Sequence, residues 1–248
     1  MKASARAVSL EAILSWRDMY RLEMNCQVIH DSIHSRVGWT VEYLLKLGDS
    51  TAGYGSLAVA GPWKAKPTIF EFYVMPQFRA RVFDLFSVLL SESGAKAIEV
   101  QSNDVLITVM LHTFAQNILA ESILYEDRFT TSHAPHDAAF RKRSSDAADP
   151  SYQLDNDAKY VIEFEGKIVA AGDILFHYNR PYGDIYMKVA ELFRRRGFGS
   201  YLVQELKRVC YEGGSVPAAR CNATNTASRK TLQKAGFVPC GNILVGSL

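Results

Sequence analysis

The sequence lacks the features of several special protein classes. No apolar run approaches the roughly 18 residues that span a bilayer, and the start of the chain has no apolar segment typical of a signal peptide. It also lacks a long stripe of Lys and Arg, because the net charge of +2 comes from mixed signs spread along the chain. We therefore expect a cytoplasmic protein with neither a membrane nor a nucleic acid as partner.

Metal and disulfide patterns are absent too. The sequence has four cysteines, none in a Cys-x-x-Cys pair: Cys26, Cys210, Cys221 and Cys240. The six histidines have no third ligand at the spacing of a metal site. We expect reduced, buried thiols and no metal.

The length and composition are those of a folded protein with two domains. The chain has 248 residues, of which 48% are hydrophobic and 22% charged. That is enough apolar material for two cores of ordinary size.

The two halves resemble each other at an offset of about 115 residues. Residues 43–47 and 52–57 match 160–164 and 169–174, and Phe78-Arg79 matches Phe193-Arg194. Each half shows a hairpin, a third β run, a helix, a strand and another helix. The pattern predicts two copies of one α/β unit.

The boundary between the copies falls in a segment with turn and loop chemistry, residues 131–158. We assign one domain to residues 1–132 and the other to residues 133–248, with a short first strand of the second copy near residues 139–143. A long helical pattern from Leu10 to Ile33 precedes the first hairpin, whereas only about fifteen loop-like residues precede the second.

A candidate phosphate site lies in the second half. Residues 182–189 read as a strand and are followed by a turn that opens a helix, namely Arg194, Arg195, Arg196, Gly197, Phe198, Gly199 and Ser200. Glycine lets backbone N–H groups approach a phosphate at a helix N-terminus. Arginines there are repelled by the helix dipole unless a polyanion is bound. We therefore predict that this turn holds a pyrophosphate.

These residues match the Arg/Gln-x-x-Gly-x-Gly/Ala motif of the GNAT superfamily of acyl-CoA N-acyltransferases, which the second half resembles. Residues 225–237 are similar to the Asn-x-x-Ala/Ser … Lys-x-Gly-Phe segment of the same family. The resemblance implies acetyl-CoA as cofactor, with Asn225 and Ser228 at positions that contact its pantetheine arm. It implies an α/β fold of two GNAT-like units, each a mixed, mainly antiparallel sheet flanked by helices.

In the first half Arg79 aligns with Arg194, but Val82 and Asp84 stand in place of the two glycines. A branched side chain blocks close backbone approach, and a carboxylate repels phosphate. We expect the first copy to have lost its coenzyme site.

The resemblance implies direct attack by a neutral amine on the bound thioester, with a backbone N–H of the strand between Met187 and Val189 holding the oxyanion. Leu232 occupies the position where many members carry a Tyr that protonates the thiol. Met187 and Val189 lie on one strand face, whereas Asp184, Tyr186 and Lys188 lie on the other unless a bulge re-aims them.

The residues leave the general base open between Asp184, Tyr186, Lys188 and His177, the last of these at the end of the hairpin. The expected function is transfer of an acetyl or short acyl group to a primary amine of a small molecule. The missing Tyr keeps open a non-catalytic acyl-CoA-binding or sensing protein, and modification of a protein N-terminus or lysine is a third possibility.

Overall fold

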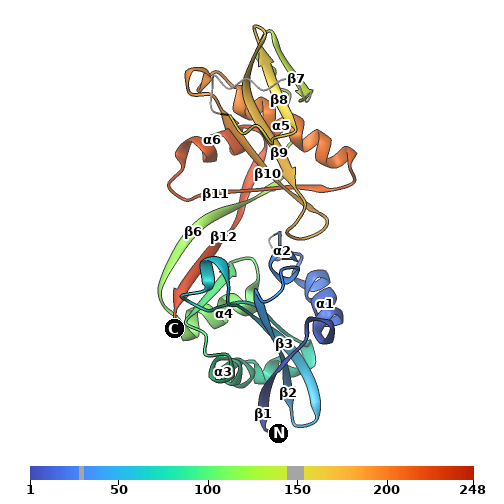
Figure 1. Ribbon diagram of the computed structural model, residues 1–248, viewed down its shortest axis with the longest axis vertical. Helices are drawn as coiled ribbons and strands as arrows, with labels where there is room; N and C mark the ends of the chain where they lie inside the picture. The colour runs from blue at the N-terminus through green and yellow to red at the C-terminus, as the bar shows by residue number, and fades with distance from the viewer. Residues whose placement is uncertain (28–30, 144–153) are drawn as a thin grey trace. The chain divides into compact units, whose positions relative to one another are not determined.

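A computed structural model describes residues 1–27, 31–143 and 154–248. The chain forms two compact units (Figure 1). The first unit contains Met1–Glu121 together with Gly241–Leu248, and the second contains Ser122–Cys240.

The first unit has a mixed sheet in the order β1-β2-β3-β4-β5-β12, in which only β4 and β5 are parallel. Its strands are β1 (Ala3–Val8), β2 (Thr40–Leu47), β3 (Ser50–Ala58), β4 (Thr68–Val74), β5 (Ala97–Gln101) and the end of β12 (Phe237–Ser247). Its helices are α1 (Leu14–Met24), α2 (Asp31–His34), α3 (Val82–Ser93) and α4 (Val105–Phe114), with short 3-10 turns at Leu10–Ile13, Gly61–Trp63 and Pro76–Arg81.

The second unit repeats this architecture in the order β6-β11-β10-β9-β8-β7, with β10 and β11 as its parallel pair. Its strands are β6 (Gln116–Asp127), β7 (Ala138–Lys142), β8 (Tyr160–Phe164), β9 (Lys167–Leu175), β10 (Tyr182–Val189) and β11 (Val216–Asn222). Its helices are α5 (Phe198–Glu212) and α6 (Thr226–Lys234), and a 3-10 turn lies at Glu191–Phe193. The predicted fold class is confirmed.

The two halves of the sequence exchange their last strands. Residues 122–126 of β6 pair with β11 of the second unit, and residues 243–247 of β12 pair with β5 of the first. The halves predicted from the sequence, 1–132 and 133–248, differ from the units in these two strands. Periodicity identifies a strand, but it carries no information about which sheet accepts it.

The region before the first hairpin differs from the single helical pattern of the sequence. Strand β1 pairs with β2 along its whole length and was not expected. Helix α1 ends at Met24 because Asn25 takes a left-handed conformation with φ of 48°. In the second unit, residues 154–159 contain no helix, and residues 144–153 of the expected loop lie outside the described part.

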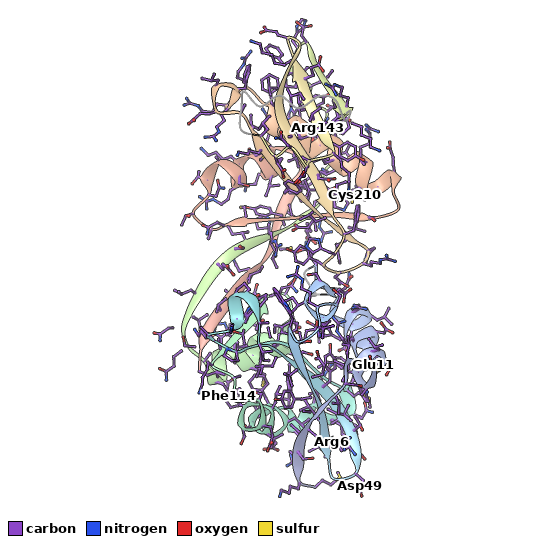
Figure 2. All side chains as sticks on the ribbon, viewed as in Figure 1. Arg6, Glu11, Asp49, Phe114, Arg143 and Cys210 are labelled. Carbon is purple, nitrogen blue, oxygen red and sulfur yellow. The ribbon has the colours of Figure 1, made fainter. Side chains whose placement is uncertain are left out.

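Helix α5 covers one face of the second sheet. It places Leu202, Val203, Leu206 and Cys210 among fully buried side chains of β9 and β10. Cys210 is labelled among them in Figure 2. Burial raises the pKa of its thiol to about 11, so it stays protonated and unreactive at neutral pH.

A buried lysine joins three segments of the second unit. Lys207 Nζ on α5 donates to the carbonyl oxygens of Phe129 and Ala235 at 2.8 and 2.6 Å, and pairs with Asp127 at 2.6 Å. Gly236, with φ of 92°, lies directly against Phe129. A Cβ at Gly236 would come within 1.9 Å of the Phe129 carbonyl oxygen. The clamp fixes the turn after α6.

Gly236→Ala should therefore destabilise the second unit by about 2 to 4 kcal/mol, since it combines a backbone clash with a disfavoured φ. Gly214→Ala is the matched control, with φ of 75° but nothing within 4 Å of its Cβ. Thermal melting of both variants tests this. Equal melting temperatures for the two variants would show that the contact with Phe129 does not matter.

No helix in the described ranges is long and apolar enough to cross a membrane.

Candidate functional site

The predicted phosphate turn has a strained backbone. Arg195 and Gly197 take positive φ angles of 63° and 91°, and α5 begins at Phe198. Alternation of left-handed residues with ordinary ones is typical of turns whose N–H groups converge on an anion. Arg195 adopts this conformation at a steric cost, which is common at binding sites. The turn thus fits a pyrophosphate at the N-terminus of a long helix.

The two glycines of the motif have different roles. A Cβ at Gly197 would meet only Pro135, at 3.6 Å, so glycine is needed there for its φ angle. At Gly199 a Cβ would lie 3.2 Å from Thr231 Cγ2 and 3.3 Å from Val189 Cγ2. Gly199 therefore lets α5 pack closely against both α6 and β10, on the same face of the sheet.

The three arginines of the turn also differ. Arg194 donates from Nε to the carbonyl oxygen of Val189 at 3.4 Å, which ties the turn to the end of β10. The guanidinium of Arg196 stacks over the rings of Phe164, Phe193 and Phe198 at 4.7 to 5.5 Å. This cation–π packing, which the sequence did not reveal, makes Arg196 a support for the turn. All three arginines are exposed, and Arg194 also pairs with Glu191, with Nη1 3.7 Å from Oε1.

Strand β10 offers backbone donors to a gap in the sheet. The parallel pairing of β10 with β11 ends at Asp184 and Ala218, after which the strands separate. On its other side β10 pairs with β9 in unbroken antiparallel register, and Ala190 N–H donates to the Val169 carbonyl at 2.9 Å. Because partners alternate along a strand, Met187 and Val189 direct their N–H groups into the gap. These are the predicted donors to the acyl oxygen.

Helix α6 borders this gap. Asn225 caps the helix, accepting from the Ser228 N–H at 3.0 Å, so both predicted pantetheine residues lie at its N-terminus. Leu232 is buried in the core of the second unit with Ala219 and Cys221 of β11. The helix therefore presents no hydroxyl at that position.

Three of the candidate bases, Asp184, Tyr186 and Lys188, lie on the other face of β10. No bulge re-aims them, since the register with β9 is regular. The Asp184 side chain is 13% exposed and pairs with Arg220 of β11, whose Nε lies 3.2 Å from Asp184 Oδ2. Burial raises the pKa of Asp184 to about 6, against the opposing effect of Arg220. Arg220 is a site residue that the sequence did not reveal.

Two further candidates surround this pair. Burial, a hydrogen bond to Asp155 and nearby carboxylates raise the pKa of Tyr186 to about 12. His177 is exposed and lies against Tyr178 with ring centroids 4.3 Å apart, and Tyr178 in turn contacts Arg220. Tyr178 and Arg220 thus form a chain of contacts from His177 to Asp184. Lys188 is exposed near the end of the strand.

The corresponding turn of the first unit is closed by ion pairs. Arg79 donates from Nε to the Val74 carbonyl at 3.0 Å, the same contact that Arg194 makes with Val189. Its guanidinium pairs with Glu23 at 2.6 Å, and Arg81 pairs with Asp84. Val82 is buried as the first residue of α3. These cations already have carboxylate partners, and no glycine lies in the turn.

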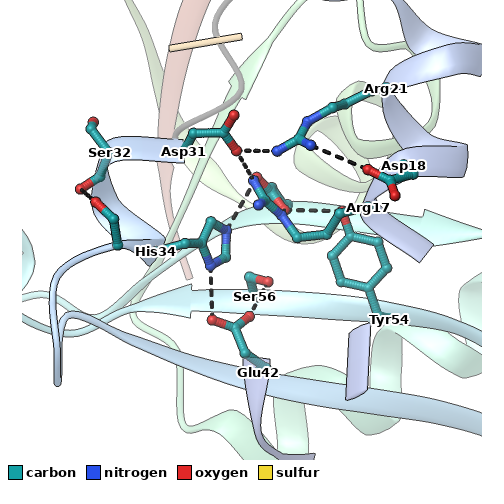
Figure 3. Close-up of polar contacts among 11 residues, drawn as sticks. Arg17, Asp18, Arg21, Asp31, Ser32, His34, Glu42, Tyr54 and Ser56 are labelled. Atoms are coloured by element: carbon teal, nitrogen blue, oxygen red, sulfur yellow. Dashed lines mark hydrogen bonds and ion pairs between the residues drawn. The ribbon is translucent and has the colours of Figure 1, made fainter. Parts of the chain in front are cut away.

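The first unit contains a buried charge network where the second has Tyr186 (Figure 3). Glu71 on β4 accepts two hydrogen bonds from Arg17 at 2.8 and 2.9 Å and one from Tyr54, and its Oε1 lies 3.3 Å from His34 Nε2. His34 also contacts Glu42 at 2.9 Å. Arg17 and His34 hold the pKa of Glu71 well below its usual value, although burial opposes them. Arg17, His34, Glu42 and Glu71 are all buried, and their charges are paired with one another, so we interpret the network as part of the core.

The first unit has a corresponding gap between β4 and β5, and this gap is narrow. Pairing of β4 with β5 ends at Ile69 and Ile98, and a cavity of about 10 Å³ lies beyond it, enough for one water molecule. Tyr20 closes it by donating to Asp104 at 2.6 Å. Asp104 caps α4 as Asn225 caps α6. The first unit thus keeps the fold, and that it has lost a coenzyme site stays a prediction.

Comparison with known proteins agrees with this geometry. The acetyltransferase (GNAT) family matches residues 123–237. An acetyltransferase of the GNAT family from Colwellia psychrerythraea has a TM-score of 0.74 at 13% identity, with 99% of each chain covered. A tandem GNAT protein from the clavulanic acid biosynthesis pathway has a TM-score of 0.65 at 12% identity, covering 100% of this chain and 98% of its own.

A GCN5-related N-acetyltransferase from Sphaerobacter thermophilus has a TM-score of 0.63 at 14% identity, covering 99% of this chain and 95% of its own. No curated protein matches the sequence significantly. At such low identities the solved structures show a shared fold and no more. The family match spans nearly the whole second unit. Residues 123–237 therefore match the GNAT acetyltransferase family, and the whole chain shares the fold of the GNAT structures.

Proposed function

We propose that the second unit transfers an acetyl or short acyl group from coenzyme A to a primary amine of a small molecule, in a cytoplasmic setting. The observation that carries the proposal is the alignment of the strained turn at Arg195 and Gly197 with the gap beyond Asp184. The turn proposed to bind the pyrophosphate follows β10, whose Met187 and Val189 N–H groups face the gap. A long thioester with a pyrophosphate requires these two features in sequence. The first unit is proposed as a copy without a coenzyme site.

Acetyl-CoA, when bound, supplies an activated thioester. The turn residues Arg194 and Arg195 then hold its phosphates, and Asn225 and Ser228 border its arm. The N–H groups of Met187 and Val189 donate to the carbonyl oxygen and stabilise the negative charge that grows there during attack. Holding both substrates in one geometry supplies much of the rate.

The amine approaches from the face of β10 that carries Asp184 and Tyr186. Asp184 has a pKa of about 6, which lets it be ionised and accept a proton near neutral pH. Tyr186, with a pKa of about 12, keeps its proton and can only orient the amine. We therefore assign the base to Asp184, positioned by Arg220, and an orienting role to Tyr186. His177 packs against Tyr178, which contacts Arg220, and so helps to position Arg220.

The pH dependence tests this assignment. Because the base must be ionised, kcat/KM should rise with pH through an inflection near 6. Asp184→Asn should remove that inflection and lower the rate by about 100-fold. Glu163→Gln, which removes a surface carboxylate paired with Arg141, is the matched control. An unchanged inflection in Asp184→Asn would exclude Asp184 as the base.

The folded state should show the same titration. Since the pKa of Asp184 is raised in the folded protein, the folded chain keeps a proton that the unfolded chain releases between pH 4 and 6. The stability from this group is present below pH 4 and is lost as pH rises to about 6. Denaturant unfolding of the wild type and Asp184→Asn at both ends of this range measures the difference.

Release of free thiol from acetyl-CoA across a panel of small primary amines tests the function itself. Amine-dependent release supports the transferase. Tight binding of acetyl-CoA without turnover on small amines, peptides or lysine side chains would instead make the protein a sensor.

A further inference from the structure

A tyrosine lies on the exchanged strand β6, which pairs with β11, the strand that borders the coenzyme gap. Tyr125 pairs with Ala219 of β11 and belongs to the same core as Cys221 and Leu232. Its ring is 1% exposed. Because cross-strand neighbours share a face, Tyr125 lies on the side of the sheet where α5 and α6 pack.

The hydroxyl of Tyr125 is already directed at a sulfur atom. It donates a hydrogen bond to the thiol of Cys221, on the part of β11 that has separated from β10. Burial and this bond raise the pKa of Tyr125 to about 12, against the opposing charge of Arg229 on α6. Tyr125 therefore stays neutral and able to donate over the whole physiological range.

On this basis we propose that Tyr125 donates a hydrogen bond to the coenzyme sulfur and stabilises the charge that grows on it, which rests on the proposed function. The phosphate turn, α6 and the side chains of Val189 and Met187 meet on one face at Gly199, so the arm enters the gap from that face. The sulfur then lies between β10 and β11 on the side of Cys221, where the Tyr125 hydroxyl can turn from one sulfur to the other.

The chemistry balances without a proton from Tyr125. The amine nitrogen bonds to the carbonyl carbon, the C–S bond breaks and sulfur keeps the electron pair. The amine proton passes to Asp184 on the opposite face of β10. The thiolate, held by the hydrogen bond of Tyr125, takes its proton from solvent after release. Negative charge forms at the sulfur on one face of β10, and a proton leaves the nitrogen on the other face.

Tyr125→Phe should lower kcat about 10- to 100-fold while the Kd for coenzyme A changes less than threefold, because one donor to the reacting atoms is lost and the ring is kept. Tyr211→Phe is the matched control, since it removes the hydroxyl of an exposed tyrosine of the same unit, which donates to Asp127. A normal kcat in a well-folded Tyr125→Phe protein would overturn the proposal.

A second readout needs no turnover. In protein labelled with 13C at tyrosine Cζ, the Tyr125 resonance is identified by its loss in Tyr125→Phe. Coenzyme A should shift it more than desulfo-coenzyme A, which lacks the sulfur. Equal shifts would overturn the proposal even if the enzyme is active, whereas a sulfur-dependent shift without amine turnover would support the contact and reject only the proposed function.

Discussion

Gly197→Glu should weaken coenzyme A binding by more than 100-fold while the protein stays folded. The substitution places a carboxylate where the pyrophosphate is expected, so two like charges meet. It also puts a side chain at φ of 91°, which disturbs the N–H groups that form the cradle. Space is no obstacle, since the nearest atom to a Cβ is Pro135 Cγ at 3.6 Å.

Gly214→Glu is the control for both effects. It adds the same charge to the same unit at φ of 75°, but at the opposite end of α5. We expect its Kd for coenzyme A to match the wild type within threefold, by calorimetry at fixed ionic strength. Equal losses in the two variants would mean that charge or strain anywhere in the unit is enough, and that the turn is not the phosphate site.

A fragment of residues 131–248 should fail to fold, whereas a fragment of residues 122–240 should fold and bind coenzyme A. The 131–248 fragment corresponds to the second half of the sequence, but it lacks residues 122–126, which pair with β11. It also lacks Asp127 and Phe129, two of the three partners of Lys207. Leaving a buried ammonium without its carboxylate costs about 3 to 5 kcal/mol, comparable to the whole stability of a small domain.

The fragment of residues 122–240 keeps these contacts and omits residues 243–247, which pair with β5 of the first unit. Circular dichroism and thermal melting distinguish the two fragments. A cooperative transition in the 131–248 fragment at the temperature of the 122–240 fragment would show that β6 is dispensable, and that the strand exchange is not required for folding.

Local pattern predicted much of this fold. Alternation marked β10 at its observed bounds, and the turn from Arg194 to Ser200 opens a helix as expected. The strand exchange could not be predicted from the sequence. The residues of β6 and β12 indicate strands, but they do not indicate which of the two sheets each strand joins. Strand β1 was missed since it is short and half exposed.

The site was predictable where backbone chemistry is encoded in residue type. Glycines at 197 and 199 and the strand before them predicted a turn that opens a helix, which begins at Phe198, and phosphate binding there stays a prediction. Contacts between distant side chains were not predictable: Arg220 pairs with Asp184, and Arg196 packs on three rings that come from two parts of the unit. Tyr125 carried no signal either, because its position beside Cys221 depends on a strand pairing with β11.

Calorimetric titration of the full chain with coenzyme A tests the central claim most directly, because it counts coenzyme sites. The geometry predicts binding at one site per chain, abolished by Gly197→Glu, since Tyr20 and Asp104 close the slot of the first unit and its turn has no glycine. Two equivalent sites per chain, or binding that survives Gly197→Glu, would contradict the assignment of the coenzyme site to the second unit.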